Sequence, residues 1–597
     1  MCGLIGYSGP RDVSEVLLDS LKKLEYRGYD SAGMATVNGH LEVHKEKGEI
    51  SVMEKSMPWM EGNTGIGHTR WATCGAPSWK NAHPFLSQDR RIALVHNGII
   101  ENHNQIRKGL LENGTVFDSQ TDTEVLVHLI SQYHNGDLHA AVRRALEDVR
   151  GTYSIAVVEE FSDEVVVARK ESPLVLGLGL NENFAASDVT ALLEYTSDVV
   201  YMEDGESAVI SPRGISLHGA DGSVIDRPPS KVEWSMEEAR KGGFEHYMLK
   251  EIFEQPRSIS ETIISYIDEL ETLEILPSRR KVDSVKILAC GTSYNAGLVG
   301  KYVIEELSGI PVQVEIASEY RYTTKTNRCS LVVLITQSGE TADTLAACRE
   351  AKERGSYTLA ITNVVGSSIT READAVLFTK AGPEISVAAT KTYTAQLIAV
   401  YLLGARLAYT SRAMGEEEMR IIKASLRALP NKVSEVLDRA QSLQAAAGIF
   451  RDATSAFFIG RNRNFPSMLE GALKLKEISY VHAEGYAAGE LKHGPLALLD
   501  ESTPLVAACL DDHTYDKMVS NVSEVAARGS PILIIATDDN EECETLADHI
   551  VRVPPIEPLF SPVTLAVALQ LLSYYVAKER GMPIDKPRNL AKSVTVE

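Results

Sequence analysis

The chain has 597 residues, of which 44% are apolar, and a net charge of −22 at pH 7. A chain of this length is expected to form several domains, and its acidic balance opposes binding to nucleic-acid phosphates, so we expect no nucleic-acid partner. The longest apolar run, around 395–403, is too short to span a membrane, and no signal segment opens the chain. Seven cysteines without a CxxC pair argue against zinc and against a disulfide framework, and favour a cytoplasmic location.

The first predicted element is a buried strand, Leu4–Tyr7, which directly follows Met1-Cys2-Gly3. Removal of Met1 would give Cys2 a free α-amine beside its thiol. An α-amine titrates at about pH 7.7–8.0, so it can serve as the base for a thiol nucleophile. The alternative is a cysteine at an unordered terminus, but the strand that follows is expected to hold Cys2 in the fold.

The rest of the first third predicts strands mixed with a few helices. A helix over 13–24 follows an acidic N-cap at Asp12. Strands are expected at 34–37, 65–68, 92–96, 154–159 and 165–168, and further helices at 101–113, 123–132 and 138–149. This mixture predicts a layered α/β sandwich.

Polar clusters fall at the ends of three of these elements: 68–73, 96–98 and 121–123. Asn97 and Gly98 offer a side-chain N–H and an accessible backbone, which an oxyanion hole requires. Arg70 can hold a carboxylate and Asp122 an ammonium group, which are the two charged groups of an amino acid. Taken singly, the Asn-Gly pair is typical of a tight turn, and Asp122 could simply cap its helix. Together with Cys2, the clusters suit the opening of a glutamine amide.

Residues 2–218 resemble a class II glutamine amidotransferase domain of the N-terminal-nucleophile fold, an αββα sandwich. The motif positions that match are Cys2-Gly3, Arg27-Gly28, Arg70-Trp71-Ala72-Thr73, Asn97-Gly98 and Asp122. The resemblance implies that Cys2 is the nucleophile, that Asn97 and Gly98 form the oxyanion hole, and that Trp71 gates an internal ammonia passage. It also implies substrate contacts from three residues: Arg70, Thr73 and Asp122. Cys74 departs from the family pattern, which usually has histidine there.

Residues 213–240 are rich in turn residues and predict the exit strands of the first domain and a linker, with the linker placed at 219–245. An internal duplication follows. Similar segments recur about 170 residues apart: 287–293 and 456–462, 331–341 and 505–514, and 354–356 and 528–530. Apolar strands that alternate with helices predict two doubly wound parallel sheets, over 281–420 and 446–587, with a tail at 588–597. Ligands of such sheets bind at the carboxyl ends of the strands.

The first copy has the loop Thr336-Gln337-Ser338-Gly339-Glu340-Thr341 directly after a predicted strand. Its hydroxyls and backbone N–H groups at a helix start suit one phosphate group, although the loop is not a Walker motif. The second copy has Asp511-Asp512 at this place, which would repel a phosphate. We therefore expect one phosphate site per pair of copies, with an ordinary capped helix start as the alternative.

Glu470, Lys474 and Glu477 recur at helical spacing on one predicted face. An exposed ion pair is the alternative, but the small and apolar neighbours argue against it. His493 follows in a glycine-flanked loop, and a carboxylate near a histidine suits proton transfer along a sugar. The tail carries valines almost to its end, which predicts a docked tail that presents the amine of Lys592.

The two copies resemble sugar isomerase (SIS) domains, and the whole chain resembles the isomerizing glutamine–fructose-6-phosphate aminotransferases. Four motifs carry this likeness: 290–293, 338–344, 490–495 and 590–597. The resemblance implies L-glutamine and D-fructose 6-phosphate as substrates, no cofactor and a homodimer. It implies sugar or phosphate contacts from Ser293, Thr336, Gln337, Ser338, Thr341 and Val387. Thr336 and Ala389 stand where serine is common in the family.

The same resemblance implies the chemistry of the sugar site. Glu477 would move the proton between C1 and C2 with the help of Lys474, and Lys592 would form a Schiff base with the ketose. His493 would open the sugar ring from the neighbouring chain. The expected products are D-glucosamine 6-phosphate and L-glutamate, the first step of hexosamine synthesis.

Three alternatives are weaker. A sugar-phosphate sensor built on SIS domains would be expected to lack Cys2, Glu477 or Lys592, and all three are present. Another class II amidotransferase would need an ATP-pyrophosphatase loop or a phosphoribosyl-pyrophosphate loop in place of the repeats. A deaminase or deglycase built from SIS repeats would not need the set of glutaminase residues.

Overall fold

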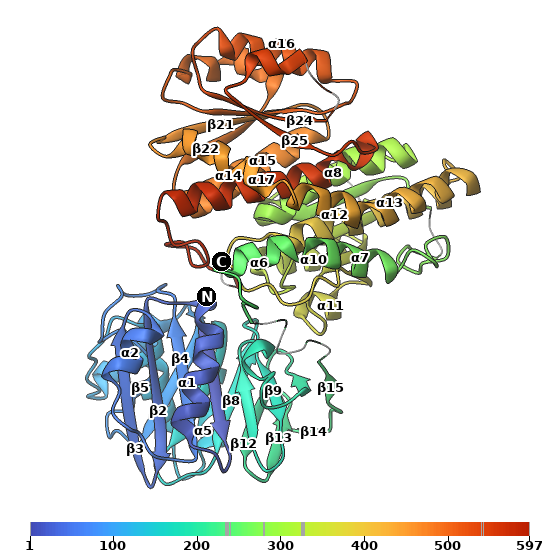
Figure 1. Ribbon diagram of the computed structural model, residues 1–597. Helices are drawn as coiled ribbons and strands as arrows, with labels where there is room; N and C mark the ends of the chain where they lie inside the picture. Colours follow the sequence, from blue (N-terminus) through green and yellow to red (C-terminus); the bar gives the residue numbers. More distant parts are fainter. Residues whose placement is uncertain are drawn as a thin grey trace. The chain divides into compact units, whose positions relative to one another are not determined.

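The computed structural model describes residues 2–232, 234, 238, 240–278, 281–323, 329–538, 540 and 542–595 (Figure 1). The chain divides into two units. The first contains Met1–Arg240, Glu340–Ala342 and Ala591–Glu597, and the second contains Lys241–Gly339 and Asp343–Leu590. Met1, whose removal would free the amine of Cys2, and the last two residues of the tail motif lie outside the described residues.

The first unit contains two antiparallel sheets whose inner faces share one apolar cluster. The first sheet has the order β15-β11-β9-β10-β1-β4-β2-β3. Its strands are β1 (Gly3–Ser8), β2 (Ser31–Asn38), β3 (His40–Lys47), β4 (Thr64–Arg70), β9 (Val175–Leu178), β10 (Asn183–Ala186), β11 (Asp198–Tyr201) and β15 (Ser230–Lys231). The second sheet has the order β14-β13-β12-β8-β7-β6-β5. Its strands are β5 (Phe85–Leu86), β6 (Ile92–Ile100), β7 (Gly151–Glu159), β8 (Val165–Lys170), β12 (Ser207–Ser211), β13 (Gly214–His218) and β14 (Val224–Ile225).

Helices cover the outer face of each sheet, as Figure 1 shows for α1. On the first sheet lie α1 (Val13–Leu24) and α2 (Ile50–Ser56), and on the second lie α3 (His103–Glu112), α4 (Asp122–Tyr133) and α5 (Leu138–Glu147). Leu17 and Leu21 of α1 pack with Ile5, whereas Ile66 and Val95 fill the space between the sheets. The resulting four layers confirm the predicted αββα sandwich. The predicted linker, however, contains β14 and β15, which are edge strands of the two sheets.

The second unit contains two five-stranded parallel sheets. The first has the order β17-β16-β18-β19-β20, with β16 (Val285–Ala289), β17 (Val312–Ile316), β18 (Leu331–Ile335), β19 (Tyr357–Thr362) and β20 (Ala375–Phe378). The second has the order β22-β21-β23-β24-β25, with β21 (Ser455–Gly460), β22 (His482–Ala487), β23 (Leu505–Cys509), β24 (Ile532–Thr537) and β25 (His549–Val553). Both sheets connect their strands in the same sequence, which confirms the internal duplication predicted from the motifs.

The helices of the second unit lie on both faces of each sheet, as doubly wound sheets require. In the second sheet, α16 lies on one face and α14, α15 and α17 lie on the other (Figure 1). The helices are α6 (Tyr247–Phe253), α7 (Gln255–Ile264), α8 (Gly291–Ser308), α9 (Ala317–Tyr320), α10 (Ala342–Glu353), α11 (Ser368–Glu372), α12 (Lys391–Ser411), α13 (Glu416–Leu437), α14 (Ala440–Ala446), α15 (Asn464–Ser479), α16 (Tyr515–Ala526) and α17 (Ser561–Glu579). Turns follow α7 from Ser265 onward.

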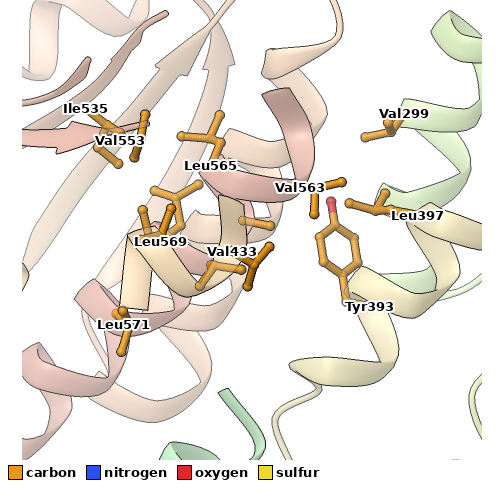
Figure 2. Packing of buried hydrophobic residues seen from close by; sticks show 14 of the residues in the cluster. Val299, Tyr393, Leu397, Val433, Ile535, Val553, Val563, Leu565, Leu569 and Leu571 are labelled. Carbon is orange, nitrogen blue, oxygen red and sulfur yellow. The ribbon is translucent and has the colours of Figure 1, made fainter. Parts of the chain in front are cut away.

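A continuous apolar cluster fills the second unit between its helices. Figure 2 shows Tyr393 and Leu397 of α12, Val433 of α13 and Leu569 of α17 in this cluster. The apolar run at 395–403 lies in α12 and is buried, as predicted. Among the described residues, one helix, Pro558–Glu579, is long and apolar enough to cross a membrane, but 94% of its apolar window is buried in the structure, as in a core helix.

Candidate active sites

Contacts from three segments fix the position of Cys2. The backbone N–H of Gly3 donates to Thr69 Oγ1 at 3.1 Å and so ties β1 to β4. The Trp71 N–H donates to Cys2 Sγ at 3.3 Å. The carbonyl oxygen of Cys2 accepts hydrogen bonds from Asn97 Nδ2 at 3.0 Å and from Arg27 Nε at 3.3 Å. The structure therefore brings the predicted nucleophile next to the predicted oxyanion residue.

The surroundings of Cys2 favour the protonated thiol. Burial raises the pKa of the Cys2 thiol, whereas the Trp71 N–H and the charges of Arg70 and Arg27 act in the opposite direction. Because the thiolate is the reactive form, the site needs a base near the sulfur. This requirement agrees with the α-amine expected from the sequence.

Two glycines let neighbouring backbone segments approach the thiol. A Cβ on Gly28 would lie 2.6 Å from the carbonyl carbon of Arg70 and 2.6 Å from the nitrogen of Trp71. Gly98 has a φ of +133°, and a Cβ there would lie 2.1 Å from the carbonyl oxygen of Thr152. Side chains at these positions would displace Trp71 or the end of β6, so only glycine fits at these two motif positions.

Arg70 is placed to bind an anionic group. It is 3% exposed, and its Nη2 donates to the carbonyl oxygens of Cys74 and Gly75. Its Nη1 is buried and has no hydrogen-bond partner among the described residues. Burial lowers the pKa of Arg70, and the acidic groups of Cys2 and Asp122 oppose this effect. A substrate carboxylate could satisfy the buried Nη1 donor.

Asp122 does not cap its helix, so the alternative interpretation of Asp122 as a simple helix cap is wrong. The N-cap of α4 is Thr121, and Asp122 is the first helical residue. One oxygen of the Asp122 carboxylate accepts the N–H of Ile100 at 2.9 Å.

Thr73 is exposed in the loop after β4. Cys74 contacts Arg70 through its backbone oxygen, a contact that does not depend on which side chain stands there.

The second unit contains a buried charge cluster between α15 and α8. Lys474 Nζ lies 2.6 Å from Glu477 Oε2, 3.4 Å from Glu470 Oε1 and 3.0 Å from Thr292 Oγ1. Glu470 also accepts hydrogen bonds from Thr292 Oγ1 at 3.1 Å and from Asn295 Nδ2 at 2.8 Å. The cluster joins α15 of the second repeat to the start of α8 in the first repeat.

The charges of this cluster stabilise one another. Lys474 is 1% exposed, so the predicted alternative of an exposed ion pair is wrong. Although burial acts to lower its pKa, Glu477 and Glu470 raise the pKa of Lys474 to about 12. Burial raises the pKa of Glu470, and Lys474 and Asn295 oppose that rise. Lys474 therefore stays charged at neutral pH and can hold Glu477 in place through a charge-assisted hydrogen bond.

Two predicted phosphate-binding segments lie at the same edge of the first parallel sheet. Ser293 follows β16, and Thr336, Gln337 and Ser338 follow β18, the neighbouring strand. Carboxyl ends of adjacent parallel strands form the ligand crevice of this fold. Thr336 Oγ1 accepts the N–H of Gly339 at 3.3 Å, which closes the loop as a serine hydroxyl also could.

The other predicted residues are more widely spread. Val387 is buried and donates its N–H to the backbone of the C-terminal segment, and Ala389 lies near it, half-buried. Thr341 and Lys592 belong to the first unit, where the backbone of the tail accepts an N–H from the start of α10. Lys592 is half-buried. The His493 side chain is exposed, and its ring forms no hydrogen bond to the residues that the structure describes.

Sequence reasoning assigned no role to Thr292 or Asn295, and it grouped Glu470 with Lys474 without giving it a role of its own. The structure places Thr292 and Glu470 beside Lys474, and Asn295 beside Glu470. Glu470 stands one helical turn before Lys474, and Thr292 lies in a motif, so both had a signal in the sequence. Asn295 had none, because the packing of α8 against α15 cannot be read from residue spacing.

Comparisons with known proteins agree with this layout. Residues 53–208 match the glutamine amidotransferase domain family, and residues 280–406 and 449–580 match the SIS domain family. The glutamine–fructose-6-phosphate aminotransferase (isomerizing) of Methanosarcina acetivorans is 48% identical over 618 residues, which cover 100% of both chains. The protein of the same name from Caldanaerobacter subterraneus subsp. tengcongensis is 47% identical over 608 residues, again with 100% of both chains covered.

A solved structure also matches the second half. The C-terminal domain of glucosamine-fructose-6-phosphate aminotransferase from Francisella tularensis is 39% identical, with a TM-score of 0.55, and the match covers 58% of this chain and 100% of that chain. Full-length identity near one half over complete chains leaves little room for a different domain order. The chain belongs to the glutamine–fructose-6-phosphate aminotransferase (isomerizing) family.

Proposed function

We propose that the chain transfers the amide nitrogen of L-glutamine to D-fructose 6-phosphate with ketose-to-aldose isomerisation, giving D-glucosamine 6-phosphate and L-glutamate. The observation that carries this proposal is the presence of two different reaction sites in one chain. One is the Cys2 thiol beside the Asn97 amide, and the other is the buried Lys474 pair with Glu477.

In the glutaminase reaction, Cys2 attacks the amide carbon, and Asn97 and Gly98 stabilise the oxyanion. The buried Nη1 of Arg70 receives the substrate carboxylate, and Thr73, three residues further along the chain, contributes to the same substrate site. Asp122 receives the ammonium end. Ammonia leaves as the thioester forms, and Trp71, whose N–H touches the thiol, stands where it could gate the exit of ammonia.

In the sugar reaction, Ser293, Thr336, Gln337, Ser338 and Thr341 hold the phosphate, and Val387 contacts the sugar. The amine of Lys592 forms an imine with the ketose carbonyl with loss of water, and the ammonia from glutamine then displaces that amine at the same carbon, so that the nitrogen passes to the sugar. Glu477 moves the proton between C1 and C2, and the ammonium of Lys474 holds the Glu477 carboxylate in position. No residue of either set calls for a metal or an organic cofactor.

The exposed ring of His493 supports a homodimer, in which it would open the sugar ring bound by the partner subunit. We also propose a cytoplasmic enzyme without nucleic-acid or membrane partners, in line with the acidic charge. We propose an amidotransferase domain at 2–218, a linker at 219–245 whose first part holds the edge strands β14 and β15 of that domain, SIS domains at 281–420 and 446–587, and a tail at 588–597.

The test is an incubation with glutamine labelled with ¹⁵N in its amide and with fructose 6-phosphate, followed by mass analysis of the products. We expect glucosamine 6-phosphate that carries the label. Other ketose phosphates serve as competitors and as controls for substrate choice. Glutamate production without any labelled amino sugar, in the presence of fructose 6-phosphate, would contradict the proposal.

A further inference from the structure

Three buried histidines lie directly behind the predicted oxyanion residue Asn97. His68 lies in β4 and His96 in β6, and each is at most 2% exposed. The ring of His83 stacks on the ring of His68, with 4.0 Å between the centroids. None of the three was singled out for a role from the sequence, because His68 and His96 lie in clusters that other residues explained and His83 lies outside every motif.

The orientation of the Asn97 amide follows from its neighbours. The carbonyl oxygen of Cys2 can only accept, so the Asn97 atom 3.0 Å from it must be the donor Nδ2. The amide oxygen Oδ1 of Asn97 then faces His68 Nε2, also at 3.0 Å. His68 Nε2 lies 3.0 Å from the carbonyl oxygen of His96 as well. Because both partners are acceptors, His68 carries its proton on Nε2.

The other two rings extend this chain of donors and acceptors. The backbone N–H of His96 donates to His83 Nδ1 at 3.3 Å, so His83 carries its proton on Nε2 and points it at Thr123 Oγ1, 3.5 Å away. The Thr123 hydroxyl can then donate to His96 Nδ1 at 3.1 Å, and His96 Nε2 donates to the Thr152 oxygen at 3.4 Å. Every ring is therefore neutral and has one defined tautomer.

Burial keeps the three rings neutral. Burial lowers the pKa of His68 to about 3, and it also lowers the pKa of His83 and of His96. The charge of Arg70 acts in the same direction on His68 and His83. The donor pattern around Asn97 is thus unchanged across the physiological pH range.

We propose that His68 is a positioning residue for glutamine hydrolysis, whose Nε2–H holds the Asn97 amide with its Nδ2 group toward Cys2. This inference rests on the proposed function of Cys2 and Asn97. When the sulfur attacks the glutamine amide carbon, the carbonyl electrons move to oxygen, and an N–H of Asn97 must meet that oxygen. A flipped amide would present its own oxygen there and repel the charge. His68 sets the flip because a flipped amide would turn its Nδ2–H group toward the Nε2–H of His68, which places two donors 3.0 Å apart, and would turn its oxygen toward the carbonyl oxygen of Cys2.

The test compares His68→Leu with His68→Gln, which restores an N–H donor. For His68→Leu we expect kcat for glutamine hydrolysis to fall by about 10- to 100-fold with KM within about twofold, because an oxyanion donor acts in the transition state. Alkylation of Cys2 by iodoacetamide forms no oxyanion, so its rate should stay within about twofold of wild type. His68→Gln should recover part of the lost kcat, and a circular dichroism spectrum checks folding.

A double-mutant cycle with Asn97→Ala decides whether His68 acts through Asn97. We expect the double variant to be no slower than Asn97→Ala alone. Additive losses, or equal losses of hydrolysis and alkylation in both His68 variants, would overturn the positioning role. Unchanged hydrolysis in Asn97→Ala would overturn the oxyanion assignment itself. Normal hydrolysis in His68→Leu beside an impaired Asn97→Ala would overturn only this inference.

Discussion

Lys474 keeps its charge in the interior because three oxygen atoms surround its ammonium group. Thr292 Oγ1 accepts a hydrogen bond from the ammonium at 3.0 Å, and the carboxylates of Glu477 and Glu470 form ion pairs with it at 2.6 Å and 3.4 Å. Burying such a group costs free energy unless its partners stay in place. The residue therefore has a structural role in α15 as well as its proposed role in the sugar reaction.

Replacing Lys474 by Met is expected to lower the free energy of unfolding of the second unit by about 3–5 kcal/mol, because the two carboxylates lose their counter-charge. Lys476→Met, at an exposed position of the same helix, is the matched control, with an expected change below about 0.5 kcal/mol. Urea unfolding followed by circular dichroism measures both. Equally small changes in the two variants would show that Glu470 and Glu477 do not depend on Lys474.

The buried histidines predict how stability depends on pH. His68, with its pKa lowered to about 3, stays neutral when folded but takes up a proton when unfolded below about pH 6.5. The lowered pKa values of His83 and His96 act in the same sense. Above about pH 6.5 these rings are neutral in both the folded and the unfolded chain, so they do not change the free energy of unfolding. As the pH falls from there toward about 3, only the unfolded chain takes up the protons, and the free energy of unfolding falls. The first unit should therefore become less stable between about pH 7 and 5.5.

Thermal unfolding of the full chain at about pH 7.0 and about pH 5.5 checks this dependence. The midpoint for the first unit should fall with pH, and His68→Gln should reduce the slope, because one buried imidazole is removed. Most carboxylates titrate below this pH range, so the change in stability within it comes from the histidines. A midpoint for the first unit that rises as pH falls would be incompatible with neutral buried rings.

At the scale of elements, the end of β6 depends on Gly98. Its φ of +133° and the 2.1 Å that would separate an added Cβ from the Thr152 oxygen leave no room for a side chain. Gly98→Ala must separate β6 from β7 and move Asn97, so we expect glutamine hydrolysis to fall by about 100-fold or more. Sugar isomerisation, whose proposed proton-transfer residue Glu477 lies in the other unit, should not change.

Gly109→Ala is the matched control for this change. Gly109 lies in α3, where an added Cβ meets nothing within 4 Å. Alanine there should leave hydrolysis intact and stabilise the helix by about 0.5–1 kcal/mol. Ammonia release, measured for both variants, decides the matter: similar rates in the two would mean that the bend at Gly98 is not needed for the oxyanion hole.

Much of the fold was predictable because local patterns agreed with the final structure. Buried β1 and the core helix α12 follow from apolar runs, and the two parallel sheets follow from repeated strand-to-helix junctions. The edge strands β14 and β15 were predicted only as exit strands of the first domain without bounds, because each has two residues and lies in a turn-rich segment. Such short strands depend on pairing with a neighbour and leave no periodic signal.

The candidate sites were predictable only in part. Cys2, Asn97 and Arg70 stood in motifs whose chemistry is explicit, and the structure brings Cys2 to Asn97. The partners of Lys474 on α8 and the support of Asn97 by His68 arise from packing between segments far apart in sequence. Residue spacing carries no record of such contacts.

At the scale of the whole molecule, the two reactions are expected to be separable because the thiol of one and the proton-transfer carboxylate of the other lie in different units. Cys2 belongs to the first unit, and Glu477 belongs to the second. Removing the thiol stops thioester formation but leaves the proton-transfer carboxylate in place. Cys2→Ala should therefore release no ammonia from glutamine, yet still convert fructose 6-phosphate slowly to glucose 6-phosphate.

Glu477→Gln should have the opposite pattern, since one base serves both isomerisation and amino-sugar formation. It should lose both sugar reactions while it keeps glutamine hydrolysis. The decisive measurement is a coupled glucose 6-phosphate assay on the purified wild type and both variants, with folding checked by circular dichroism. We predict activity in the wild type and in Cys2→Ala, and none in Glu477→Gln. A folded Cys2→Ala protein without isomerase activity, beside an active wild type, would contradict the assignment of two separate sites.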